Sequence, residues 1–338
     1  MYTGKQIKVT DPFKVICENV QFDLNIEGPN DVIVKNKFSH ISAGTELACL
    51  AGIESWFTIP GIPGYTSIGE IVSIGEGVKH VKQSDLVYTY GPHAAYFKID
   101  ASDRWHGVCV KVPDGTKPEL AVFTHMATIA FTSIRKSDIE LGDNVLVTGL
   151  GVIGNMAAQL AQLQGANVIA SDIKNERIEI AKACGLKHVV NSAEEDLKAV
   201  ITAATNGKMI DTYIDASGMT PVIKHGSDLM AFGGETILLG SPRAAFDDNL
   251  TDYLKFFHYL PWCGSLKGAL EFTLPTHQNE FNKHSIERNA EIVMNLIKDE
   301  RLIVAPCFSH QITPDTMQSG YDGLKNQPDK YIGVVVEW

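Results

Sequence analysis

The sequence lacks several features that would place it outside the ordinary folded proteins. No apolar run approaches the ~18 residues of a membrane helix, so we expect no membrane partner. There is no local run of Lys or Arg, and the formal net charge is -11, which argues against a nucleic-acid surface. The first residues lack the apolar core of a signal peptide, and the six cysteines include no C-x-x-C pair. We therefore expect reduced thiols and a cytoplasmic location.

What is present is typical of a chain of about two domains. Up to about residue 111, short strands such as 31–37 and 69–75 alternate with Gly and Pro, which predicts a β-barrel-like unit. From about residue 117 the period changes to alternating strands and helices, which predicts a doubly wound parallel sheet. The expected strands are 145–147, 168–170, 188–190, 212–214 and 236–239, the last after a turn at 232–234, and the expected helices lie within 118–135 and at 155–163, 176–184 and 195–204. A helix at 286–298 and a strand at 332–336 follow, and we expect that strand to return to the first domain.

The strongest motif is the sequence G-L-G-V-I-G at residues 149–154, directly after the apolar run 145–147. A strand that ends in G-x-G-x-x-G and opens into a helix holds the pyrophosphate of a dinucleotide. Asp172 lies 18 residues after Gly154, at the end of the next predicted strand, where a carboxylate accepts the ribose hydroxyls of NAD. An ordinary turn with a surface Asp is the alternative.

Several segments in this order resemble the medium-chain dehydrogenase/reductase superfamily over essentially the whole chain. Residues 42–46 (S-A-G-T-E) are similar to its C-G-T-D/E segment, and residues 63–72 are similar to its P-x-x-x-G-H-E-x-x-G-x-V segment. Residues 85–87 (D-L-V) match G-D-x-V with Ser84 in place of the Gly, and residues 141–147 lead into the glycines as they do in that family. The resemblance implies an α/β fold, with a GroES-like β-barrel catalytic domain at residues 1–123, completed by 285–338, and a Rossmann domain at 124–284.

The departures from the family pattern concern zinc. Its zinc-dependent members bind the catalytic ion at positions that carry Ala43, Tyr65, Thr66 and His125 here. Catalytic zinc needs about three protein ligands, and only His125 is of the usual type. The four-Cys lobe that binds structural zinc is also absent, because Cys109 stands alone in that region. The resemblance therefore implies a zinc-lacking member with neither a catalytic nor a structural zinc.

Among the zinc-lacking members, the sequence resembles bacterial glycoside (guloside-type) 3-dehydrogenases. The resemblance rests on the S-x-G-T-E motif, the Y-G-P turn at 90–92 and the segment 283–288. We therefore expect NAD-dependent oxidation of a secondary alcohol to a ketone, on a sugar, polyol or glycoside, by a homodimer or homotetramer. The alternatives are a hydroxyethyl dehydrogenase of the bacteriochlorophyllide type, a quinone or enone reductase using NAD(P)H, and a nucleotide-binding protein without turnover.

Without zinc, a side chain must take the hydroxyl proton, and His is suited to that near neutral pH. His125 is the first candidate for this base, with a buried packing His as its alternative. Tyr65 could polarise the substrate oxygen or fill the space of the metal. By resemblance, Thr45 matches the family's proton-relay position, with an ordinary turn Thr as its alternative. Glu46 is expected to contact the catalytic residues and not the substrate, with a solvated or turn-stabilising role as its alternative.

The resemblance also points to binding residues. Aromatic and His residues in loops near the expected substrate site are Trp56, Tyr90 and His93, with His258 and Trp262 as further members. The expected cofactor residues are Gly149, Gly151, Val152, Ile153, Gly154, Asp172, Arg177, Ser217 and Gly240. The Asp172 carboxylate would repel the 2′-phosphate of NADP and therefore favours NAD. Lys174 and Arg177 are basic and lie nearby in the sequence, so NADP stays an alternative.

Overall fold

The computed structural model describes residues 1–338, which form two compact units. Unit 1 consists of Met1–His125 and Leu274–Trp338, and unit 2 is Met126–Thr273. The sequence placed the boundaries after residues 123 and 284, whereas the units divide after 125 and 273. The second division lies earlier because the segment after Thr273 already bonds to unit 1, where Thr276 donates to the Arg104 carbonyl.

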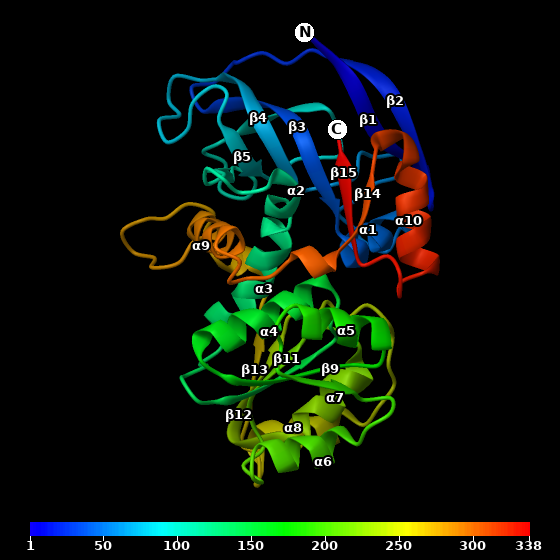
Figure 1. The fold of residues 1–338 in the computed structure, drawn as a ribbon, viewed down its shortest axis with the longest axis vertical. Coiled ribbons are helices and arrows are strands. Elements are labelled where there is room, and N and C mark those ends of the chain that lie inside the picture. Colours follow the sequence, from blue (N-terminus) through cyan, green and yellow to red (C-terminus); the bar gives the residue numbers. More distant parts are fainter. The chain divides into compact units, whose positions relative to one another are not determined.

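Unit 1 is built on a seven-stranded sheet, with a separate two-stranded β1–β2 hairpin (Figure 1). Along the main path the order is β14-β15-β3-β4-β5-β7, and β6 pairs with the other end of β3. All pairs are antiparallel except β14–β15. The strands are β1 (Tyr2–Asp11), β2 (Lys14–Phe22), β3 (Asp31–Ile41), β4 (Ser67–Ile74), β5 (Leu86–Thr89), β6 (Tyr96–Asp100), β7 (Cys109–Lys111), β14 (Phe308–Ile312) and β15 (Gly333–Glu337).

The strand expected near the end of the chain does return to this sheet. β15 pairs with β3, with Val334 opposite Ile41, which makes it an interior strand between β3 and β14. That position explains its run of three buried valines, since an interior strand covered on both faces has no solvent side. Each such side chain contributes about 1.5–3 kcal/mol by its burial.

The helices of unit 1 cover this sheet and connect its segments. α3 begins in unit 1 and continues into unit 2. The helices are α1 (Ala43–Leu50), α2 (Pro118–Ala121), α3 (Thr124–Lys136), α9 (Ile286–Lys298), α10 (Met317–Asn326) and the short 3-10 turns η2 (Ala305–Cys307) and η3 (Pro314–Thr316). α10 packs on α1 and β2, and its Tyr321 and Leu324 enter the same core as Ile7, Leu50 and Val334.

Unit 2 is a six-stranded, wholly parallel sheet in the order β10-β9-β8-β11-β12-β13. Counted from β8, this is the 3-2-1-4-5-6 order of a doubly wound dinucleotide-binding sheet. The predicted α/β fold is thereby confirmed. The elements are β8 (Asn144–Thr148), α4 (Val152–Gln164), β9 (Asn167–Asp172), α5 (Asn175–Ala183), β10 (His188–Asn191), α6 (Leu197–Ala204), β11 (Ile210–Asp215), α7 (Thr220–Ser227), β12 (Met230–Leu238), α8 (Leu250–His258), β13 (Ser265–Gly268) and η1 (Glu271–Thr273).

One predicted turn is wrong. Residues 232–234 do not precede the strand but lie inside β12. Ile210 pairs with Met230 and Thr212 pairs with Glu235, so the extra residues form a bulge in the ladder. Gly233, at φ 76°, adopts a left-handed conformation that lets the chain bulge and then rejoin the sheet.

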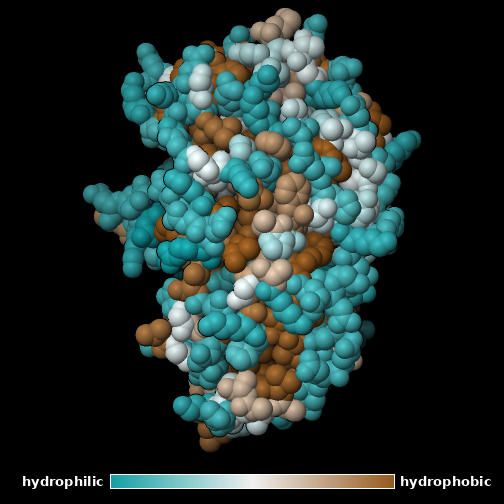
Figure 2. All heavy atoms as spheres, viewed as in Figure 1, coloured by the Kyte–Doolittle hydropathy of each residue, from teal (hydrophilic) through white to brown (hydrophobic).

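The surface is mixed in character. On the face drawn in Figure 2, hydrophilic side chains predominate and apolar patches interrupt them. No helix in the chain is both long enough and apolar enough to cross a membrane.

Candidate functional site

The glycine turn of unit 2 links the end of β8 to the start of α4. Gly149 has φ 86°, a left-handed conformation that favours glycine. Gly151 caps α4 without any side-chain bond, and a Cβ added there would meet nothing within 4 Å. A Cβ at Gly154 would lie 1.8 Å from the Gly149 carbonyl oxygen. The space beside Gly151, at the N-terminus of α4, is therefore open, and the positive end of a helix dipole suits a pyrophosphate there.

Asp172 is positioned beside this turn at the end of β9. Its carboxylate accepts the backbone N–H of Leu150 at 2.7 Å, of Ile173 at 2.7 Å and of Lys174 at 3.0 Å. Arg177 Nη1 makes a fourth and longer contact at 3.4 Å. A carboxylate has about four lone-pair sites, so an incoming hydroxyl would share or replace the Arg177 contact. Asp172 thus also fixes the glycine turn, a role that the motif did not reveal.

The carboxyl ends of β8, β11 and β12 bring three predicted cofactor residues together. A Cβ on Gly149 would lie 2.9 Å from the Ser217 amide, and one on Gly240 would lie 2.3 Å from the Gly218 amide. Asp215 fixes this loop by accepting the Ser217 hydroxyl at 2.6 Å and the Gly218 amide at 2.9 Å. Burial raises the pKa of Asp215, although these donors act against the shift. The switch point of the sheet is therefore lined by close-packed backbone, as ligand sites in such folds are.

In unit 1, His125 lies in the first turn of α3 and is buried. Its Nδ1 is 3.0 Å from the Tyr65 carbonyl oxygen and 3.0 Å from Thr66 Oγ1. A carbonyl oxygen only accepts, so the partners assign the proton to Nδ1. In the neutral ring Nε2 then carries the lone pair, which is the nitrogen that can take a proton.

Three aromatic side chains fix the orientation of the His125 ring. Tyr90 stacks on it at 4.4 Å with an interplanar angle of 8°. Tyr65 meets it edge-on at 4.9 Å, and Tyr88 does so at 6.1 Å. The structure thus brings together His125, Tyr65 and Tyr90, which the sequence had proposed for separate roles.

Glu46 is the most deeply buried charge near this group. Its carboxylate accepts the Ser42 amide at 2.8 Å, His93 Nε2 at 3.0 Å and the Tyr321 hydroxyl at 2.5 Å. Burial acts to raise the pKa of Glu46, but His93 and the other donors outweigh it and hold the pKa below its ordinary value. Glu46 is therefore a charged, fully bonded group inside unit 1.

The other candidates of unit 1 are placed differently. His93 was expected in a loop near the substrate; it does lie in a loop, but its side chain is fully buried, and Glu46 and Ser39 contact its two ring nitrogens. Trp56 is 62% exposed and its Nε1 donates to Glu54. Thr45 is half-buried in the first turn of α1. Their predicted roles stay predictions.

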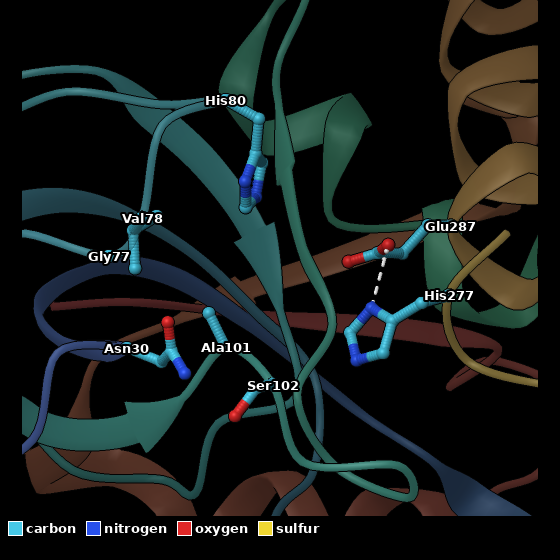
Figure 3. A pocket seen from close by; sticks show the side chains of 8 residues that line it. All are labelled: Asn30, Gly77, Val78, His80, Ala101, Ser102, His277 and Glu287. Carbon is cyan, nitrogen blue, oxygen red and sulfur yellow. Dashed lines mark hydrogen bonds and ion pairs between the residues drawn. The ribbon is translucent and has the colours of Figure 1, made fainter. Parts of the chain in front are cut away.

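Unit 1 also contains a cavity of about 330 Å³ that the sequence did not signal (Figure 3). His277 and Glu287 line one side of it, opposite Asn30. His277 Nδ1 contacts the Glu287 carboxylate at 3.0 Å and its Nε2 contacts the Asp103 carbonyl at 3.2 Å. The ring of His277 therefore bridges the Glu287 carboxylate and the Asp103 carbonyl, both of which accept hydrogen bonds. The pair ties the start of α9 to the loop after β6.

His40 on β3 makes unit 1 sensitive to acid. Both of its ring nitrogens are buried without a hydrogen-bond partner, and its ring packs 4.8 Å from that of Phe123. Burial lowers the pKa of His40 from 6.5 to about 4, while Glu46 raises it slightly and His93 and His125 lower it. Between these values the unfolded chain takes up a proton that the folded chain does not. The free energy of unfolding is therefore expected to fall by about 3 kcal/mol as the pH drops through this window.

Urea unfolding between pH 7 and pH 5 measures the upper part of this window, where we expect the free energy of unfolding to fall by about 2 kcal/mol and Glu46 to contribute little. The variant His40→Leu should flatten the pH dependence, whereas His188→Ala, at an exposed position, should leave it unchanged. An equal slope in His40→Leu would assign the acid sensitivity to other groups.

The matches to known proteins cover residues of both units. Residues 152–283 match the family model described as zinc-binding dehydrogenase. L-threonine 3-dehydrogenases of Escherichia coli strains are 26% identical, over 92% of this chain and 93% of theirs. The solved galactitol-1-phosphate dehydrogenase from Escherichia coli has a TM-score of 0.84 at 16% identity, covering 99% of this chain and 100% of that one. Alcohol dehydrogenase from Thermus sp. ATN1 has a TM-score of 0.80 at 20% identity, covering 98% and 99%. At these identities the two structures show the fold.

Proposed function

We propose that this chain is a member of the medium-chain dehydrogenase/reductase superfamily and that it oxidises a secondary alcohol to a ketone with NAD. The observation that carries the proposal is the state of His125. Its Nδ1 proton is held by the Tyr65 carbonyl, which leaves the basic lone pair on Nε2. The chain thus has a buried, oriented proton acceptor of the kind that alcohol oxidation requires.

The proposed chemistry divides between the two units. NAD, when bound at the glycine turn and Asp172 of unit 2, supplies the hydride acceptor. In unit 1, His125 Nε2 takes the hydroxyl proton as the carbon of the alcohol loses its hydrogen as hydride. The imidazolium that results keeps its Nδ1–H bond to the Tyr65 carbonyl, and this bond strengthens as charge develops. Stacking on Tyr90 keeps the ring in one orientation throughout.

We further propose that this reaction needs no catalytic zinc. The side chains at the family's ligand positions do not fit the ion, because Ala43 offers no donor atom and Thr66 Oγ1 is bonded to His125. His125 Nδ1 is itself a donor toward a carbonyl, so only its other nitrogen remains as one ligand of the three that zinc needs.

For the cofactor, we propose NAD in preference to NADP. The Asp172 carboxylate would accept ribose hydroxyls and repel a 2′-phosphate. Its Arg177 contact, at 3.4 Å the longest of the four, is the one that a ribose would replace. For the substrate, we propose a sugar, polyol or glycoside, supported by the resemblance of the sequence and by the aromatic surroundings of His125.

The test is the appearance of NADH over a panel of glycosides, polyols and simple secondary alcohols, with and without a chelator. We expect turnover with NAD that persists after chelation. Loss of activity on chelation would overturn the metal-free mechanism, and a strict requirement for NADP would overturn the role of Asp172. Turnover only with NADPH and a quinone or enone would identify a reductase instead, and tight NAD binding without hydride transfer would identify a sensor.

A further inference from the structure

The bonds around Glu46 continue beyond His93. His93 Nδ1 lies 2.8 Å from Ser39 Oγ, and Trp338 Nε1 donates to the same oxygen at 2.8 Å. The carboxylate of Glu46 can only accept, so His93 Nε2 carries a proton. Ser39 then donates to Nδ1 of a neutral His93 or accepts from a cationic one. Both ring nitrogens of His93 therefore have a hydrogen-bond partner in either charge state, and these two bonds prevent the ring from rotating.

His93 is in turn connected to the segment that holds His125. The His93 amide donates to the Pro63 carbonyl at 2.8 Å. Gly64, at φ 96°, packs against the His93 ring so closely that a Cβ there would lie 2.7 Å from ring atoms. The next residues, Tyr65 and Thr66, supply the carbonyl and the hydroxyl that contact His125 Nδ1. A continuous series of contacts therefore runs from Glu46 through His93 and the segment 63–66 to His125.

We propose that Glu46 and His93 are positioning residues that hold the segment 63–66 and thereby set the tautomer and orientation of His125. The inference rests on the proposed function where it concerns turnover. It gives His93 a role inside unit 1 in place of the substrate contact that the sequence suggested. A shift of about 1 Å in such a supporting segment can lower a rate by about a hundredfold. Glu46→Gln keeps only one acceptor oxygen, so its amide NH₂ must face either the Ser42 amide or the His93 and Tyr321 donors, and the bonds of this group must rearrange.

The test compares Glu46→Gln with Asp31→Asn. Asp31 is a matched control because its buried carboxylate accepts the Glu27 and Gly28 amides in the same unit and lies outside this series of contacts. The first readout needs no substrate, since ¹⁵N imidazole NMR reports the tautomer of His125. We expect an Nδ1–H ring in the wild type and in Asp31→Asn, and a mixture of tautomers in Glu46→Gln.

The second readout is kinetic. Glu46→Gln is expected to lower kcat by about tenfold or more with the KM for NAD changed by less than about twofold, while Asp31→Asn leaves both within about twofold. Should Glu46→Gln not fold, His93→Gln carries the test, because it can still donate to Glu46 but lacks the ring against which Gly64 packs. An unchanged His125 tautomer in a folded variant, or equal effects in the variant and the control, would overturn the proposal. If no alcohol is oxidised by the wild type, the proposed function fails while the NMR result still decides this inference.

Discussion

Replacing His125 with alanine is expected to lower kcat by about a hundredfold or more, because a positioned general base contributes on that order. The variant removes the nitrogen that we propose takes the hydroxyl proton. Steady-state kinetics with the best alcohol of the panel measure the loss. His188→Ala is the control, since its side chain is exposed at the start of β10 in unit 2.

A second variant separates proton transfer from packing. His125→Asn keeps an N–H that can donate to the Tyr65 carbonyl, but it has no basic lone pair. We expect its kcat to be as low as that of the alanine variant, with a free energy of unfolding closer to the wild type. A loss of kcat below about threefold in both variants, with the fold intact, would remove His125 from the mechanism.

The architecture was largely predictable because it depends on local signals. The glycine turn at 149–154 and the alternation of apolar strands with helices predict a parallel sheet, and the sheet of unit 2 has the expected order. The bulge in β12 was not predictable, because a Gly-Gly pair signals a turn equally well outside a strand and within one. The difference between the two depends on Thr212 and Glu235, whose pairing the sequence does not encode locally.

The site was predictable only one residue at a time. His125 and Tyr65 were chosen because of the family positions they occupy, and the structure shows that they contact each other. Tyr321, which donates to Glu46, is 275 positions away in sequence and gave no signal of its own. His93 was predicted in a loop because Gly91 and Pro92 precede it, and it does lie in one, but its burial beside partners on α1 and β3 had no local signal. Such long-range polar contacts depend on the tertiary fold, not on local pattern.

The glycine turn allows two substitutions with opposite consequences. Gly154→Ala places a Cβ 1.8 Å from the Gly149 carbonyl oxygen and 2.9 Å from Ala216 Cβ, so the backbone of the turn must move. We expect the free energy of unfolding to fall by about 3 kcal/mol or more, since overpacking against backbone has no cheap relaxation. NAD binding should be lost as well, because α4 would no longer approach β8 closely.

Gly151→Ala is the matched control for that substitution. A Cβ there meets nothing within 4 Å, and the residue has φ -61° and ψ -178°, an extended conformation that alanine also adopts. The free energy of unfolding should therefore change by about 1 kcal/mol or less, as for other caps of this kind. NAD affinity should nevertheless fall by about tenfold or more, because the added methyl occupies the space where the pyrophosphate meets the backbone. Thermal unfolding and calorimetric titration with NAD measure the two quantities separately. Wild-type stability in Gly154→Ala would contradict the close approach of α4 to β8. Wild-type affinity for NAD in Gly151→Ala would place the pyrophosphate elsewhere. A phosphate held at this turn is therefore supported only if Gly151→Ala folds without binding NAD and Gly154→Ala is destabilised.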